Sequence, residues 1–375
     1  MDTRPPPRAR AGLRDVASGL MPCVAEPALR VGVVGYGLAG DVFHAPLIVA
    51  TPGLTLAAVV TSNLERQAKA ARDHPGILVA PTAAQLWERS AELDLVVIAS
   101  PNVTHVPLAL AALAHGLHVV VDKPFAPSAV DGERLIAEAR GRSLLITPFH
   151  NRRWDGDFLT VQRLVREGVL GEVLRFESRF ERWRTAPKPR WCEASASGEA
   201  EGIVFDLGTH LVDQALVLFG PVRSVQAEID RRHPDVTVPD DAFIALEHAG
   251  GTRSHLYMSA FVAQPHLRMG IFGRLGSYVK SGMDVQEGAL RAGQRPGGRG
   301  WGDEAADRHG ELRIGDARRE ISTEAGAYQR FYEALVRSIP GDLEPPVAPD
   351  DAVAGLRVIE AAYRSAAEGR CVQIG

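Results

Sequence analysis

The chain has 375 residues, which is enough for two domains with separate hydrophobic cores. Hydrophobic residues make up 45% and charged residues 23%, ordinary proportions for a globular protein, and no apolar run has membrane-spanning length. The formal net charge of −4 provides no basic field and argues against a nucleic-acid partner. The three cysteines are scattered without a CxxC spacing, and the 12 histidines show no ligand pattern. We therefore expect no disulfide framework, no metal site and a cytoplasmic location.

The first 28 residues differ from the rest in composition. They are rich in Pro, Arg and Ala and lack the apolar core of a signal peptide. We expect a disordered tail over 1–28. Met21 is an alternative start of translation, because the first strand is predicted only from Leu29.

From Leu29 to about Pro148, apolar strands alternate with helical stretches. The predicted strands are 29–34, 54–61, 93–100, 118–122 and 144–147, and the predicted helices are 39–50, 64–72, 83–90, 104–115 and 128–140. The strands are apolar nearly throughout, as parallel strands with helices on both faces are. The pattern predicts an α/β Rossmann domain over 29–148, built on a doubly wound parallel sheet.

After Phe149, strands follow one another with little helix between them. The segment 173–182 alternates apolar and charged residues, and further strands are predicted at 224–231, 242–247, 254–261, 267–272 and 277–280. Predicted helices are 158–167, 206–219, 327–337 and 349–367, and the Gly- and Arg-rich stretch 288–310 is predicted to be a long loop. The residues 149–375 thus predict an α+β domain with an open, mostly antiparallel sheet. Helices leave the outer face of such a sheet uncovered, so we expect a homodimer or homotetramer through it.

A glycine-rich turn follows the first predicted strand and opens the first helix, with Gly35, Gly37 and Gly40 in the spacing GxGxxG. These glycines permit a tight turn and let backbone N–H groups approach a pyrophosphate at the helix N-terminus. A purely structural turn is the alternative. The strand before it and the helix after it favour a dinucleotide-binding loop.

The position about 20 residues further on often holds the acidic residue that binds an adenosine ribose. Here it holds Ser62 and Asn63, followed by Arg66 and Lys69. Small polar groups beside cations suit a 2′-phosphate, so we predict NADP as the cofactor. NAD is the alternative, with Glu65 or Asn63 on the ribose.

Ser100, Pro101 and Asn102 end another predicted strand, at the carboxyl edge where ligands bind in open α/β sheets. A simple turn is the alternative for such residues. The predicted cofactor-binding residues are Gly35, Tyr36, Gly37, Leu38, Gly40, Ser62, Asn63, Arg66, Ser100, Pro101, Asn102, His105, Asp122 and Lys123.

Three polar residues are candidates for proton chemistry. Lys123 is one of only four lysines among 42 basic residues and follows a predicted strand end. Lysine can titrate where arginine cannot. Asp206 and His210 are four residues apart at the head of a predicted helix, and so share one face. A solvated lysine, a helix cap and a packed histidine are the alternatives, but together with the glycine loop these residues predict a proton-transfer site.

Residues 29–375 resemble the Gfo/Idh/MocA oxidoreductase family, which joins a Rossmann domain to an α/β domain with an open sheet. Its E-K-P motif corresponds to Asp122-Lys123-Pro124, and its D-x-x-x-H motif to Asp206 and His210. Four segments are similar to the branch that contains NADP-dependent scyllo-inositol 2-dehydrogenases: 35–48, 150–160, 206–220 and 284–296.

The resemblance implies hydride exchange between NADP(H) and a secondary alcohol or ketone of a cyclic polyol, such as scyllo-inositol and its inosose. His210 would accept the hydroxyl proton, Lys123 would hydrogen-bond that oxygen, and Asp206 would orient His210 or bind a neighbouring hydroxyl. Asn151 and Arg152 are candidates for other substrate hydroxyls, with a helix cap as the alternative.

One departure from the family pattern is the Asp at position 122, where Glu is usual. Its side chain is one methylene shorter, so we expect the carboxylate contact near the nicotinamide or Lys123 to be lost or made through water. Two other functions stay open. One is a dehydrogenase or reductase of an aldose or keto-sugar derivative, and the other is a non-catalytic sensor like the fungal galactose-regulon repressor. The intact Lys123, Asp206 and His210 argue against the sensor.

Overall fold

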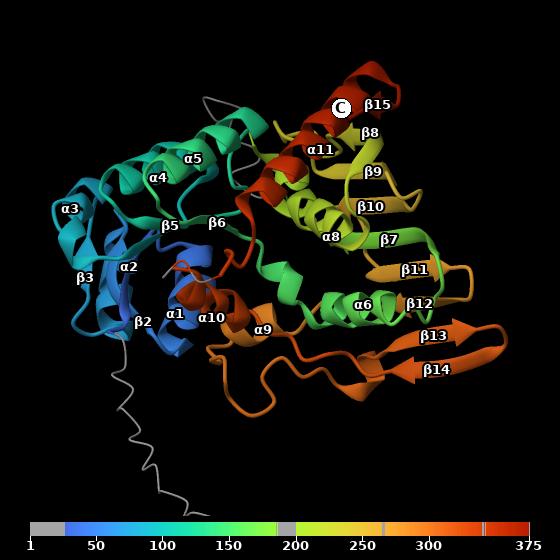
Figure 1. The fold of residues 1–375 in the computed structure, drawn as a ribbon, viewed down its shortest axis with the longest axis horizontal. Coiled ribbons are helices and arrows are strands. Elements are labelled where there is room, and N and C mark those ends of the chain that lie inside the picture. The colour runs from blue at the N-terminus through green and yellow to red at the C-terminus, as the bar shows by residue number, and fades with distance from the viewer. Residues whose placement is uncertain are drawn as a thin grey trace, which may run out of the picture.

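The computed structural model describes residues 27–184, 186, 200–264, 267–339, 341 and 343–374. Of the predicted tail 1–28, all but the last two positions lie outside the described residues. Figure 1 shows two layered units side by side, with the long helix α11 (Pro349–Glu368) running between them.

The first unit is built on a parallel sheet of six strands in the described part of the chain. In spatial order these are β3 (Leu78–Ala80), β2 (Leu54–Val60), β1 (Leu29–Val34), β4 (Leu95–Ile98), β5 (His118–Asp122) and β6 (Ile146–Phe149). Every neighbouring pair is parallel, which confirms the predicted Rossmann sheet. The short strand β3 was not predicted, because three residues are too few to show a pattern. The strand order reverses between β1 and β4, which is where such sheets bind ligands.

Helices cover both faces of this sheet. One face packs against α3 (Ala83–Trp87), α4 (His105–Ala114) and α5 (Ala129–Gly141). The other packs against α1 (Ala45–Ala50), α2 (Leu64–Asp73) and α10 (Gln329–Ser338). Helix α10 comes from far along the chain, so residues that follow most strands of the second sheet return to complete the first core (Figure 1).

The second unit is a nine-stranded sheet within the described residues. Its spatial order is β14 (Ala317–Ile321), β13 (Gly310–Ile314), β12 (Gly276–Lys280), β11 (Met269–Gly273), β7 (Val173–Glu181), β10 (Arg253–Ser259), β9 (Asp241–His248), β8 (Val222–Asp230) and β15 (Val372–Gln373). Only the central pair β7–β10 is parallel among these strands, which confirms the mostly antiparallel prediction.

Two local predictions for this unit were incomplete. The hairpin β13–β14 was not predicted. In β13, Leu312 and Ile314 alternate with Glu311 and Arg313, but this pattern spans only five residues, and β14 is exposed at four of its five positions. The predicted loop 288–310 contains the end of helix α9 (Gln286–Arg291) and a 3-10 turn, Ala306–Arg308. Its glycines concealed that helix, because glycine lowers helix propensity.

Helices α6 (Gly156–Arg166), α8 (Thr209–Phe219) and α11 lie on one face of the second sheet (Figure 1). Along β9 every second residue is buried, which gives the strand a covered and a wetter face. On the wetter face the Arg179 guanidinium lies 3.8 Å from the centre of the Tyr257 ring. Self-association through this face stays a prediction. In the described part of the chain, no helix has the length and apolarity needed to cross a membrane.

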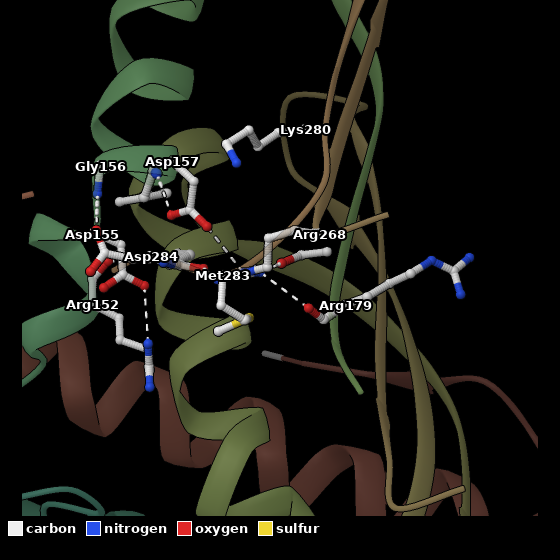
Figure 2. Close-up of polar contacts among 12 residues, drawn as sticks. Arg152, Asp155, Gly156, Asp157, Arg179, Arg268, Lys280, Met283 and Asp284 are labelled. Atoms are coloured by element: carbon white, nitrogen blue, oxygen red, sulfur yellow. Dashed lines mark hydrogen bonds and ion pairs between the residues drawn. The ribbon is translucent and has the colours of Figure 1, made fainter. Parts of the chain in front are cut away.

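A buried cluster of charges ties the start of α6 to this sheet (Figure 2). Arg268 Nε lies 3.2 Å from Asp157 Oδ2, and both side chains are at most 2% exposed. Arg268 Nη1 also donates to Ser178 Oγ on β7 at 2.7 Å. Nearby, Asp284 Oδ2 accepts from the Gly156 backbone N–H at 2.8 Å. Burying a charge without a partner costs free energy. These paired contacts therefore hold the start of α6 against the second sheet.

We predict that Arg268→Met lowers the free energy of unfolding by about 3–5 kcal/mol, because it leaves the Asp157 carboxylate buried without its cation. Urea unfolding followed by circular dichroism measures the change. Arg274→Met is the matched control: Arg274 and its partner Glu172 are both more than half exposed, so that variant should unfold close to the parent protein. Equal unfolding of the two variants would contradict the prediction.

Candidate active site

A cavity of about 850 Å³ lies between the two sheets. Its floor is the carboxyl edge of the parallel sheet, with the glycine turn after β1 and the ends of β4 and β5. Its other wall comes from the 3-10 turn Asn151–Trp154, the end of β7, the π-helical turn Val204–Gly208 and helix α9. Both units therefore contribute side chains to one space.

The glycine turn has the geometry that a pyrophosphate needs. Gly35 has φ +100°, and a Cβ there would lie 2.5 Å from the Ala99 carbonyl oxygen. A Cβ on Gly40 would collide with the Gly35 carbonyl oxygen. At Gly37 the space is open, with Arg66 Nη1 the one neighbour, 3.7 Å from a would-be Cβ. The turn thus exposes backbone at Gly37, while Gly35 and Gly40 are required for its shape, and it fits a dinucleotide phosphate.

Of the residues predicted near the adenosine ribose, some line the cavity and others do not. Ser62 and Arg66 line the cavity. Asn63 caps helix α2 instead, where its Oδ1 accepts from the Arg66 backbone N–H at 2.9 Å. Neither Asn63 nor Glu65 belongs to the cavity wall.

Lys69, the second cation predicted near the ribose, does not line the cavity and is paired with carboxylates. Its Nζ donates to Asp41 Oδ1 at 2.6 Å and to Asp73 Oδ2 at 2.7 Å. Lys69 is therefore neutralised by two carboxylates, and Arg66 is the cation that reaches the cavity at this end.

The ends of β4 and β5 are joined by His105. Its Nδ1 lies 2.8 Å from the Pro124 carbonyl oxygen, and its Nε2 lies 2.9 Å from the Ser100 carbonyl oxygen. Asn102 Nδ2 donates to the Ala200 carbonyl oxygen of the second unit at 2.7 Å. These contacts hold the predicted cofactor edge in one shape and connect it to the second unit.

Lys123 reaches across from the end of β5. Its Nζ donates to the Asp206 carbonyl oxygen at 2.6 Å and to Asp206 Oδ1 at 3.0 Å. Both side chains are less than one-fifth exposed. The structure thus pairs two of the three predicted proton-transfer residues, although 83 positions separate them.

Asp206 lies in the π-helical turn Val204–Gly208, and His210 lies in the first turn of α8 behind it. His210 is 5% exposed. Burial, followed by the charges of Lys123 and Arg152, holds the pKa of His210 well below the 6.5 of an ordinary histidine. Its Nδ1 is buried without a hydrogen-bond partner among the described residues. The ring nitrogen left to face the cavity is therefore Nε2.

Asp122, the short residue at the family's Glu position, also lines the cavity. Its Oδ1 accepts from the backbone N–H of Lys123 at 2.7 Å, and its Oδ2 lies 3.9 Å from His44 Nε2. Burial acts to raise the pKa of Asp122, but His44 and Lys123 outweigh it and hold the pKa below its ordinary value. The contact with Lys123 is thus made through the backbone.

Asn151 and Arg152 both line the cavity and are buried. Arg152 Nη2 donates to Glu287 Oε2 at 2.7 Å, and its Nη1 donates to Asp155 Oδ2 at 3.2 Å, the pair visible in Figure 2. Its guanidinium also lies 4.7 Å from the centre of the Phe180 ring. Arg152 is therefore held in the cavity wall by two carboxylates and an aromatic ring.

Several cavity residues were not predicted, above all Glu287, Arg182 and Arg184. Glu287 lies in segment 284–296, which the family resemblance had already marked, so that segment was a usable signal. Arg182 and Arg184 follow a strand on which charged side chains alternate with apolar ones, and nothing in that alternation shows which charges face a cavity.

The predicted site residues converge. All of them line the cavity except Gly40, which shapes the glycine turn, and Asn63, which caps α2. Among the described residues, no group of three or more His, Cys, Asp or Glu side chains is arranged to hold a metal ion.

Comparison with known proteins agrees with this architecture. Residues 29–150 match the NAD-binding Rossmann-fold model of the Gfo/Idh/MocA oxidoreductases, and residues 162–374 match their C-terminal alpha/beta domain model. The oxidoreductase YdgJ of Escherichia coli is 40% identical over 90% of this chain and 96% of its own length. The scyllo-inositol 2-dehydrogenase (NADP⁺) IolW of Bacillus subtilis is 33% identical over 92% and 96%. The solved structure of oxidoreductase yvaA from Bacillus subtilis superposes with a TM-score of 0.86, at 32% identity over 93% and 99% of the two chains. The chain therefore belongs to the Gfo/Idh/MocA oxidoreductase family and carries an NAD(P)-binding Rossmann domain.

Proposed function

We propose that this oxidoreductase uses NADP(H) and acts on a secondary alcohol or ketone of a cyclic polyol, with scyllo-inositol and its inosose as the leading pair. The observation that carries the proposal is the meeting of Lys123, Asp206 and His210 in one cavity with the glycine turn. The similarity to IolW, whose name gives that substrate and cofactor, supports the choice.

The cofactor, when bound, supplies the acceptor or donor of hydride. The backbone at Gly37 would hold its pyrophosphate, and Ser62 and Arg66 would hold its 2′-phosphate. The open space above Gly37 and the nearness of Arg66 support this assignment.

In the oxidation direction, His210 accepts the substrate hydroxyl proton at Nε2. Because its pKa lies well below that of an ordinary histidine, the ring is neutral at pH 7 and able to accept. Lys123 donates a hydrogen bond to the same substrate oxygen and stabilises the negative charge that develops on it. Asp206 keeps the Lys123 ammonium in place. In reduction, His210 returns the proton to the carbonyl oxygen.

The second candidate substrate is a sugar derivative that carries an acidic group. The observation that favours it is the presence of four guanidinium groups in the cavity wall besides that of Arg66, namely those of Arg152, Arg182, Arg184 and Arg291. Arginine binds carboxylates and phosphates through paired hydrogen bonds. A simple aldose or keto-sugar belongs to the same reaction class.

The substrate assignment predicts NADP-linked turnover with an inositol. Absorbance at 340 nm should rise with NADP⁺ and scyllo-inositol or myo-inositol, and more slowly with glucose, xylose or glucuronate. Turnover confined to the sugars would keep the mechanism and replace the inositol. Tight NADPH binding without turnover of any of these compounds would contradict the enzyme proposal and favour the sensor.

Lys123→Met should lower kcat by about 10³-fold or more, because it removes both the hydrogen-bond donor and the charge beside the reacting oxygen. NADPH affinity, measured by fluorescence titration, should stay within about twofold of the parent value, since the glycine turn is untouched. A variant with normal kcat would exclude the proposed role of Lys123.

Arg66→Ala should weaken NADPH binding by about 1.5–3 kcal/mol, the range of a hydrogen bond to a charged group, and leave NADH binding nearly unchanged. Arg72→Ala, on the same helix but 70% exposed and paired with Asp73, is the control and should change neither affinity. Equal loss for the two nucleotides in Arg66→Ala would remove the 2′-phosphate assignment.

A further inference from the structure

One cation in the cavity wall lacks a partner among the described residues. Arg182 directly follows β7, is partly buried and lines the main cavity. Its backbone is fixed beside the end of β10, because its N–H donates to the Ser259 carbonyl oxygen at 2.9 Å and its carbonyl oxygen accepts from the Val262 N–H at 3.1 Å. Its guanidinium lies 4.9 Å from the centre of the Phe180 ring and takes part in no ion pair or hydrogen bond within the part of the chain that the structure describes.

Two other guanidinium groups near the same ring differ in this respect. Those of Arg152 and Arg268 lie 4.7 and 5.9 Å from the centre of the Phe180 ring. Each of them is paired with at least one carboxylate. Of the three cations around this ring, Arg182 is therefore the one without an anion among the described residues.

The carboxylates that act on Arg182 are engaged by other cations. They belong to Glu287 and Asp206, and both act on Arg182 from beyond ion-pair distance. Glu287 accepts from Arg152 at 2.7 Å through one oxygen and from Arg291 at 2.9 Å through the other. Asp206 accepts from the lysine of the proton-transfer site. A shift of either carboxylate toward Arg182 would weaken its existing pair.

A partly buried guanidinium without an anion costs free energy. Burial is the largest cause that lowers the pKa of Arg182, and the positive charges of Arg184 and Arg152 act in the same direction. Arginine nevertheless keeps its proton at neutral pH. The cavity wall thus holds a cation that is partly withdrawn from water and has no anion among the described residues. A perturbed charged group in a cleft is typical of a ligand-binding site.

The Phe180 ring holds this guanidinium without using its hydrogen-bond donors. Phe180 is 1% exposed, so the ring is fixed in the core. A cation over an aromatic ring is attracted to the face of the ring, and this contact requires no N–H group. In Arg152, by contrast, carboxylates occupy both Nη atoms. Arg182 is therefore positioned by packing while its N–H groups stay available to a ligand in the cavity.

We propose that Arg182 is a substrate-binding residue whose guanidinium holds two neighbouring oxygen atoms of the substrate other than the reacting one. The proposal rests on the proposed function, which supplies the substrate. A guanidinium presents N–H groups in a fixed fork that matches two oxygen atoms at once. In a cyclic polyol these are adjacent hydroxyl oxygens. In an acidic sugar derivative they are the two oxygens of a carboxylate.

Arg182→Met tests this role through substrate binding and steady-state kinetics. Binding of scyllo-inositol and of glucuronate is measured by calorimetry on the complex with NADPH, in which an alcohol cannot transfer hydride. For the compound that the parent protein binds, the variant should lower the affinity and raise KM, each by about 10- to 100-fold. The kcat should change by less than about threefold, because the lost hydrogen bonds are present in both the ground state and the transition state. NADPH affinity should stay within about twofold of the parent value, since the glycine turn is untouched.

Arg182→Lys distinguishes the two kinds of substrate oxygen. Lysine keeps the positive charge but lacks the fork. If Arg182 holds hydroxyl oxygens, this variant should bind scyllo-inositol as weakly as Arg182→Met, because the paired geometry is lost. If Arg182 holds a carboxylate, the variant should keep a large part of the glucuronate affinity, because the charge remains. Either result supports the assignment of Arg182.

Arg175→Met is the matched control. Arg175 lies on β7, its guanidinium is 4.4 Å from the centre of the Phe272 ring, and it is paired with Glu177 outside the cavity wall. Its removal should leave substrate affinity and KM at the parent values. Unchanged substrate affinity in Arg182→Met would overturn the proposal, as would a loss of NADPH affinity as large as the loss of substrate affinity.

A crystal structure of the parent protein with NADPH and the bound compound provides a readout that needs neither turnover nor a stable variant. It should show two oxygen atoms of the compound within hydrogen-bond distance of Arg182. A bound and oxidised polyol or sugar without that contact would overturn the assignment of Arg182 and leave the proposed function intact. Absence of binding by every polyol and sugar would overturn both.

Discussion

The contact on which the rest of the site depends is an ion pair between the two domains. Lys123, at the end of β5, meets both the carbonyl and the carboxylate of Asp206 in the turn before α8. The pair can form only when the carboxyl edge of the parallel sheet faces the second sheet at one distance and angle. The position of His210, one helical turn beyond Asp206, follows from the same contact.

The chain supports this arrangement by crossing back between the domains. Helix α10 completes the core of the first sheet, and α11 packs between α5 and α8. Hydrogen bonds accompany the crossing: the Ala129 N–H donates to Glu360, and Thr147 donates to the Val347 carbonyl oxygen, each at 2.7 Å. With both domains held at several points, the two walls of the cavity are fixed relative to each other. Fixed geometry of this kind is what a site that positions reacting groups requires.

The buried charges around Arg152 show how a cation in the cavity wall is held by two carboxylates of different basicity. Arg152 lies between Asp155 and Glu287. Burial raises the pKa of Asp155, which also accepts from the Tyr328 hydroxyl at 2.6 Å, so this carboxyl is the weaker counter-ion. Glu287, whose pKa is lowered by Arg152 and Arg291 against the effect of burial, is the stronger one. Arg152 is thereby paired with two carboxylates while it lines the cavity.

The sequence alone determined the Rossmann sheet, the antiparallel character of the second sheet and the glycine turn. These features depend on local rules: apolar periodicity, and backbone conformations such as the positive φ of Gly35 that favour glycine. The family motifs added Lys123, Asp206 and His210 as predicted site residues. Only the tertiary structure decided that Arg66 faces the cavity while Lys69 is held by two aspartates, and that Arg182 and Glu287 join the wall. Those outcomes depend on distances between residues far apart in the chain. Neither the charge of a residue nor its position in the sequence shows which of two similar side chains forms an ion pair and which lines the cavity.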